Sequence, residues 1–144
     1  MRRFILLVMI AVYAVPHLSG QIKSGVTKVK THKIIFQMVS KDTADHTTLM
    51  RQIDNIVTLE PKSKLEVVCH GPGISMLMKD KSVVHDKLMV YASKKVDFVA
   101  CEFTMTQKNI SREQLVDVCR TVPGGILEIV YKQEKGWNYI KSGF

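Results

Sequence analysis

The alternation of short apolar runs with longer amphipathic stretches is the feature that most constrains this fold. Five runs have the length of a strand, and a segment long enough for a helix or a turn separates each from the next. We expect strands over residues 32–39, 64–70, 96–101, 116–122 and 137–141. We expect helices over 43–59, over 74–78, from a cap at Ser82, briefly after a capping box at Ser111, and over 124–136.

This order of elements predicts a three-layer α/β/α fold. Strands that are joined by helices pair in parallel through right-handed crossovers, so the five strands should form a mainly parallel sheet with helices on both faces. In such sheets a ligand binds beyond the carboxyl ends of the strands, at a topological switch point. Two segments fall at this edge: residues 69–73 after the second strand and residues 101–104 after the third.

The first twenty residues have the pattern of a secretory signal peptide. Arg2 and Arg3 precede an apolar stretch over residues 4–15 and a small residue, Gly20. An apolar stretch of this length spans about 18 Å as a helix, less than the ~30 Å hydrocarbon core of a bilayer. We therefore expect a periplasmic or secreted protein with no stable membrane span after cleavage; retention of the signal as an anchor is the alternative. The chain then divides into a signal peptide (1–20), a flexible lead-in (21–31) and one α/β domain (32–144).

Charge and composition exclude several classes of function. The chain has 21 Lys and Arg against 13 Asp and Glu, a formal charge of +8, but the lysines are scattered as on a solvated surface. Together with an export signal, this argues against nucleic acid as a partner. The histidines and cysteines show no metal-ligand spacing, and the sequence has no dinucleotide-binding or Walker loop. We expect neither a metal nor a cofactor.

Four segments, taken in order, carry a family resemblance. They are residues 70–74 (HGPGI), residues 96–105 (VDFVAC, then Thr104 and Met105), residues 122–126 (VPGGI) and residues 133–141 (QEKGWNYIK). Together they resemble the DsrE/DsrF-type sulfur-relay family over about residues 33–141. The resemblance implies a bacterial three-layer α/β protein that assembles into homotrimers or hexamers. It also implies that a cysteine, here Cys101, carries a persulfide between a sulfur donor protein and an acceptor.

Cys101 is the candidate catalytic residue. A sulfur carrier needs a thiolate, and a position at a strand end before a helix favours the ionised thiol. Glu102 and Phe103 depart from the small or polar residues that family members often have here, and Glu102 would oppose ionisation if it faced the sulfur. The alternative is that Cys101 is a small buried residue that closes an apolar strand. Whether the protein is an enzyme, such as a sulfurtransferase, or a sulfur carrier is open.

Neighbouring residues have weaker assignments. His70 points away from Cys69 along the strand, and it could act as a proton shuttle for Cys101 or hold the Gly-Pro-Gly turn by hydrogen bonds. Thr104 could donate a hydrogen bond to a sulfur anion or cap the segment behind it. Cys69 and Cys119 are expected in the core, and a disulfide between Cys69 and Cys101 is open.

A different class of function fits the same edge. Backbone N–H groups near Gly71 and Gly73 could hold a small anion or a partner peptide, which would make the protein a non-catalytic binding module. An oligomeric scaffold for another exported protein is a third hypothesis. Substitution of Cys101 separates sulfur handling from both alternatives, because neither of them needs the thiol.

Overall fold

The computed structural model describes residues 31–143 of the 144-residue chain. The signal peptide expected over residues 1–20 and the lead-in up to residue 30 lie outside the described residues. Between residues 31 and 143, no helix combines the length and the apolar character that a membrane crossing requires.

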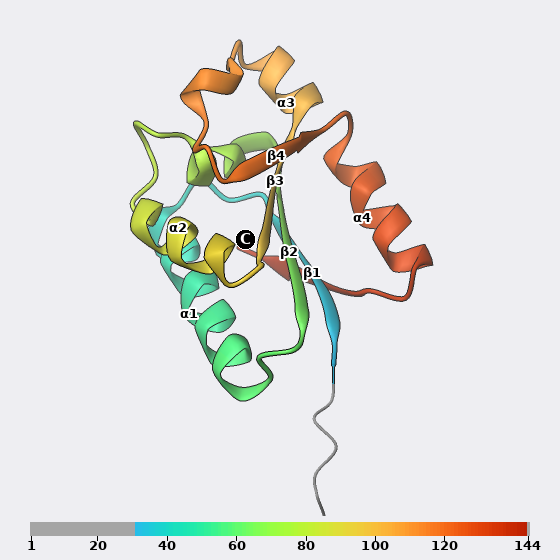
Figure 1. The fold of residues 1–144 in the computed structure, drawn as a ribbon. Helices are drawn as coiled ribbons and strands as arrows, with labels where there is room; N and C mark the ends of the chain where they lie inside the picture. Colours follow the sequence, from blue (N-terminus) through green and yellow to red (C-terminus); the bar gives the residue numbers. More distant parts are fainter. Residues whose placement is uncertain (1–30, 144) are drawn as a thin grey trace, which may run out of the picture.

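Five strands form one sheet in which every neighbouring pair is parallel. The order across the sheet is β4-β3-β2-β1-β5, so the chain moves outward from β1 to β4 and then returns to place β5 beside β1 (Figure 1). The strands are β1 (Lys33–Met38), β2 (Lys64–Cys69), β3 (Asp97–Cys101), β4 (Cys119–Val122) and β5 (Asn138–Ser142).

Local sequence sets where the long first helix begins. α1 (Thr43–Leu59) starts after Asp42, whose carboxylate accepts a hydrogen bond from the Ala44 N–H at 2.8 Å. Its apolar side, including Leu49 and Ile53, is fully buried. The other helical segments are η1 (Gly71–Leu77), α2 (His85–Ser93), α3 (Glu102–Gln107), η2 (Arg112–Gln114) and α4 (Gly125–Glu134), where η denotes a 3-10 helix.

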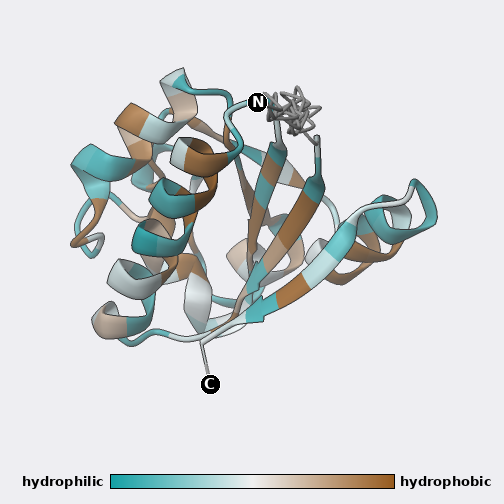
Figure 2. Ribbon diagram, turned by 90° about the horizontal axis from the view of Figure 1, so that it is seen from below, coloured by the Kyte–Doolittle hydropathy of each residue, from teal (hydrophilic) through white to brown (hydrophobic). Residues whose placement is uncertain are grey.

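Helices cover the two faces of the sheet unequally. The crossovers from β1 to β4 all move in one direction, so right-handed connections keep α1 and α2 on one face. The return from β4 to β5 runs the other way and places α4 on the opposite face (Figures 1 and 2). Alternate strand residues therefore face two separate cores. Those in the large core include Phe36, Val67 and Phe98, and those in the small core under α4 are Ile35, Val68, Val99 and Val122. The predicted three-layer fold is confirmed.

Two local predictions are wrong. Ser82 does not cap α2, because its N–H closes a turn onto the Met78 carbonyl and the helix begins only at His85. The fourth strand is limited to Cys119–Val122 rather than residues 116–122. The Arg112 guanidinium donates hydrogen bonds to the carbonyls of Leu115, Val116, Asp117 and Cys119. These bonds hold the segment before Cys119 in a turn, outside the sheet.

Candidate functional site

Neighbouring connections diverge at one point on the carboxyl edge of the sheet. After β3 the chain enters α3, whose Met105 packs in the large core on the α1 side. After the adjacent strand β4 it enters α4 on the opposite face. Cys101 ends β3 and Gly125 begins α4, and the Gly125 N–H donates a hydrogen bond to the Cys101 Sγ at 3.2 Å. The switch point between β3 and β4 therefore holds a thiol.

Hydrogen bonds favour the thiolate form of Cys101. The residue is 5% exposed, and burial by itself would raise the thiol pKa. Hydrogen bonds from the Gly125 N–H, from the Thr104 N–H and hydroxyl, and from the Phe103 N–H outweigh burial, so the net shift in the pKa is downward. The Glu102 carboxylate accepts a hydrogen bond from the Thr121 hydroxyl at 2.6 Å.

The other two thiols have a different environment. Cys69 and Cys119 lie in the large core, and burial raises the pKa of both. All three cysteines are free. The disulfide between Cys69 and Cys101 that the sequence left open does not form. The strand register pairs Cys69 with Ala100, so Cys101, one residue farther along, points to the opposite face. Cys101 is thus the one cysteine whose thiol pKa is lowered.

His70 borders the start of α4 beside Cys101. A Cβ added at Gly125 would lie 3.1 Å from the Cys101 Cβ and 3.3 Å from the His70 Cβ. The His70 ring, however, bonds to Gln37: the Gln37 amide donates to the His70 Nε2 at 2.7 Å, and the Gln37 oxygen accepts from the Tyr139 hydroxyl. Burial lowers the pKa of His70, which favours the neutral acceptor form. No hydrogen bond found among residues 31–143 joins this ring to the sulfur.

The N–H groups of Gly71 and Gly73, which were the candidates for holding an anion, both donate hydrogen bonds within the protein. The Gly71 N–H donates to the Thr104 Oγ1 at 2.9 Å, and the Gly73 N–H donates to the His70 carbonyl at 3.1 Å. The backbone of His70, rather than its ring, therefore closes the turn. Gly73 also packs on β1 so closely that a Cβ would lie 2.2 Å from the Met38 carbonyl oxygen. Neither N–H is free for a ligand, and Gly73 is required for packing.

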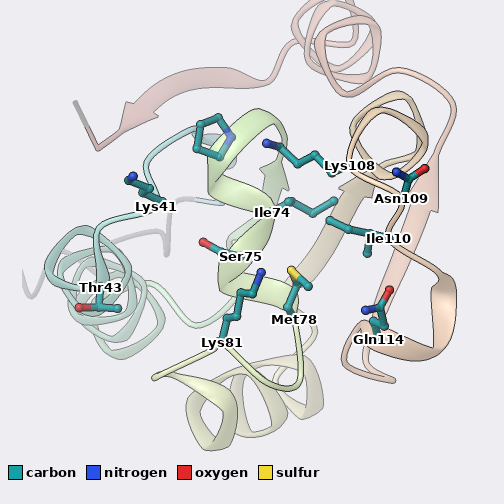
Figure 3. Close-up of a pocket in the computed structure, with 11 residues that line it drawn as sticks. Lys41, Thr43, Ile74, Ser75, Met78, Lys81, Lys108, Asn109, Ile110 and Gln114 are labelled. Carbon is teal, nitrogen blue, oxygen red and sulfur yellow. The ribbon is translucent and has the colours of Figure 1, made fainter.

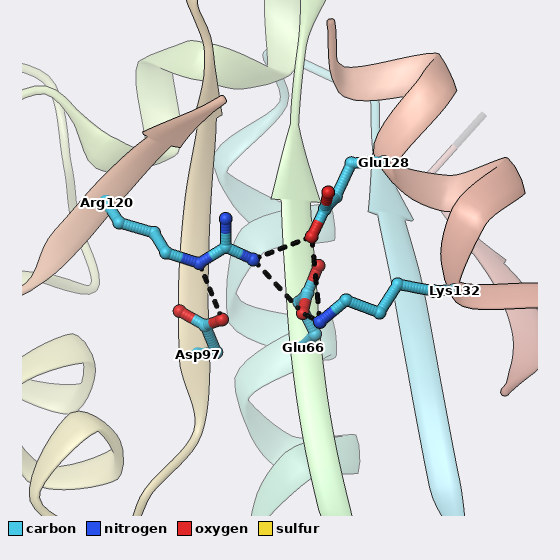
Figure 4. Close-up of polar contacts among 5 residues, drawn as sticks. All are labelled: Glu66, Asp97, Arg120, Glu128 and Lys132. Carbon is cyan, nitrogen blue, oxygen red and sulfur yellow. Dashed lines mark hydrogen bonds and ion pairs between the residues drawn. The ribbon is translucent and has the colours of Figure 1, made fainter. Parts of the chain in front are cut away.

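Five charged side chains between α4 and the sheet were missed by the sequence analysis. They are Glu66 of β2, Asp97 of β3, Arg120 of β4, and Glu128 and Lys132 of α4 (Figure 4). Arg120 contacts Asp97 and Glu128 at 2.8 Å each and Glu66 at 3.3 Å, and Lys132 pairs with Glu66. Burial raises the pKa of Glu66 to about 7 despite these two cations. The ion pairs fasten α4 to the sheet and so hold Gly125 against Cys101. The available signal was the charged residues inside three expected strands: Glu66 in 64–70, Asp97 in 96–101 and Arg120 in 116–122.

These observations define a class of protein: a three-layer α/β/α domain with a hydrogen-bonded thiol at the switch point of a parallel sheet. In the part of the chain that the structure describes, no group of three His, Cys, Asp or Glu side chains could hold a metal ion.

Comparisons with known proteins support the fold. No protein-family model and no curated protein matches the chain. Among solved structures, it is similar to the protein of unknown function MTH1491 from Methanobacterium thermoautotrophicum, with a TM-score of 0.73 and 24% sequence identity. The match covers 76% of this chain and 98% of that one. At this identity the likeness shows the fold alone.

Proposed function

We propose that this protein is a DsrE-like sulfur carrier that holds sulfane sulfur as a persulfide on Cys101. The observation that carries the proposal is the contrast among the three thiols. Burial raises the pKa of Cys69 and Cys119, whereas hydrogen bonds lower the pKa of Cys101. A thiolate is the form that attacks sulfane sulfur, so Cys101 is the thiol best suited to this chemistry.

The loading step needs only a donor persulfide. The Cys101 thiolate attacks the outer sulfur of R–S–SH, a new S–S bond forms, and the donor bond breaks to release R–S⁻. The proton stays on the transferred sulfur, which leaves Cys101–S–SH. The Gly125 N–H and the Thr104 hydroxyl, which stabilise the attacking thiolate, would also stabilise it again when an acceptor removes the sulfur.

Location and assembly belong to the same proposal. Residues 1–20 have a signal-peptide pattern, so we place the carrier outside the cytoplasm of a bacterium. We also propose a homotrimer or hexamer that meets donor and acceptor proteins. Phe103, beside the thiol, is 70% exposed, and the outer side of α4 presents further apolar side chains: Ile126, Leu127, Val130 and Tyr131. Light scattering that returned the mass of one chain would refute the assembly.

Intact-mass measurement tests the sulfur chemistry. Treated with a low-molecular-weight persulfide, the unsubstituted protein should gain the mass of one sulfur atom, and Cys101→Ser should gain none. Cys119→Ser is the matched control, because Cys119 is buried in the large core and its substitution should leave loading intact. Equal loading of Cys101→Ser and the unsubstituted chain would show that Cys101 is not the carrier.

A further inference from the structure

An open groove lies on the α1 side of the same sheet edge and takes no part in the thiol site. It encloses about 900 Å³ between the start of α1, η1 and the segments that follow η1 and α3 (Figure 3). This volume is in the range of small-molecule sites, and the carboxyl edge of a parallel sheet is where such folds bind ligands.

The charged groups at the groove are all cationic. Lys41, Lys81 and Lys108 come from three separate segments, and no Asp or Glu is among the described lining residues. None of these three lysines forms an ion pair within residues 31–143, although Lys79 and Lys132 do. In Figure 3 the ammonium ends of Lys81 and Lys108 extend over the groove from opposite sides. Three unpaired like charges around one hollow attract an anion.

Hydroxyl groups add a second recognition element. The Ser75 Oγ is buried, and it has no hydrogen-bond partner in the described part of the chain. Its oxygen points toward the groove between Lys41 and Lys81 (Figure 3). Because this Oγ has almost no accessible surface, it meets a ligand atom only after rotating into the groove, and that rotation breaks no hydrogen bond since the hydroxyl has no partner in the described chain. Thr43, at the start of α1, adds another hydroxyl to the lining.

The remaining surface of the groove is apolar. Pro72 is exposed and Ile110 half-buried in the lining, and they lie over Ile74 and Met78, which belong to the large core. An inorganic anion would contact the cations but leave the exposed surface of Pro72 and Ile110 in water. A ligand that satisfies both parts of the lining carries negative charge at one end and an apolar group at the other.

We propose that this groove binds a small organic anion with at least two negative charges and a flat or aliphatic apolar group. The proposal is independent of Cys101, because the groove opens on the α1 side of the sheet and Cys101 lies on the α4 side. Cys101→Ser should therefore leave binding in the groove unchanged, so the sulfur proposal and this one stand or fall separately.

Titration calorimetry with 1-naphthyl phosphate as the probe tests the proposal. A ligand of this size with ordinary efficiency should bind with a Kd of about 0.5 mM at low salt. Inorganic phosphate and 1-naphthol, the two halves of the probe, should each bind at least about tenfold more weakly. Absence of saturable probe binding would overturn the proposal, and equal affinity for inorganic phosphate would overturn the role of Pro72 and Ile110.

Matched triple variants locate the binding site. Neutralising the groove in K41Q/K81Q/K108Q should weaken probe binding about tenfold. The control K62Q/K64Q/K95Q removes the same charge from exposed lysines at the amino-terminal edge of the sheet, and its affinity should stay close to that of the unsubstituted chain. Equal weakening in both triples would mean that net charge, not the groove, attracts the probe.

A substitution at Ser75 separates ligand binding from folding. Ser75→Ala removes a hydroxyl that has no partner within the described chain, so the thermal midpoint should not fall. The probe should nevertheless bind about threefold more weakly, since one hydrogen bond is lost. A lower thermal midpoint with unchanged probe affinity would show that Ser75 supports the fold and not the ligand.

Discussion

The hydrogen bond from Gly125 to Cys101 can be weakened without removing either group. Alanine at Gly125 would place its Cβ 3.1 Å from the Cys101 Cβ and 3.1 Å from the Val68 Cγ1, closer than ordinary contacts. The start of α4 must then move back by a few tenths of an ångström. Gly124→Ala is the matched control, because the nearest atom to its new Cβ is 3.7 Å away.

The size of the effect follows from the hydrogen bond that is lost. A hydrogen bond to a charged group contributes about 1.5–3 kcal/mol, and 1.36 kcal/mol corresponds to about one pKa unit. Partial loss of the Gly125 bond should therefore raise the Cys101 pKa by about one unit. The free energy of unfolding should change by less than about 1 kcal/mol, because two effects oppose each other. Alanine has a higher helix propensity than glycine, whereas the close contacts of its Cβ are unfavourable.

Alkylation kinetics measure this pKa directly. Burial raises the pKa of Cys69 and Cys119, whereas the pKa of Cys101 is lowered, so Cys101 has the largest thiolate fraction and should react first with iodoacetamide in the folded protein. At pH values below the thiol pKa, Gly125→Ala should react about tenfold more slowly than the unsubstituted chain, because its thiolate fraction is lower. Gly124→Ala should match the unsubstituted chain. Indistinguishable pH profiles for the two variants would refute the role assigned to the start of α4.

Three further substitutions probe other contacts. Thr104→Val removes a hydroxyl that bonds both to Cys101 and to the Gly71 N–H, so it should raise the Cys101 pKa in the same alkylation assay and lower stability by about 1–2 kcal/mol. The pKa of Glu66 is about 7 in the folded chain against a usual 4.5, so the folded chain keeps a proton that the unfolded chain has released. The contribution of Glu66 to the free energy of unfolding should thus fall as pH rises from 4.5 to above 7, and denaturant titrations of Glu66→Gln should lack this part of the pH dependence. Arg112→Lys should lower the free energy of unfolding by about 2 kcal/mol, because one ammonium group cannot donate to all four carbonyls. Denaturant titration measures this loss, and an unchanged denaturant midpoint would contradict it.

The first three strands could be predicted because each is an apolar run between polar segments, whereas β4 and β5 are short and partly polar, and the bounds of β4 were predicted wrongly. The same pattern placed Cys101 at the carboxyl edge of the sheet, where the structure has it. The Ser111–Gln114 capping box, a purely local pattern, is also present as predicted. Such features depend only on residues that are close in the sequence, so the local sequence is sufficient to predict them.

The surroundings of Cys101 could not be predicted in the same way. The sequence indicated the helix directly after Cys101 as the source of N–H donors, and α3 does provide some of them. Gly125, however, lies 24 residues farther along, and its contact depends on α4 crossing to the other face of the sheet. The cluster around Glu66 joins three strands and α4, so its members share no sequence spacing. The order of the strands, which local patterns do not encode, determines both the Gly125–Cys101 contact and the cluster around Glu66.

If Cys101 carries a persulfide as we propose, the separation of the cysteines by the sheet has a consequence for how the loaded protein discharges. Cys69 and Cys119 lie on the far side from Cys101, so the chain has no resolving thiol for a persulfide at that position. Internal attack cannot expel hydrosulfide and close a disulfide. Discharge then needs a nucleophile from another molecule. The lifetime of the persulfide therefore depends on how often the protein meets an acceptor, not on an intramolecular reaction.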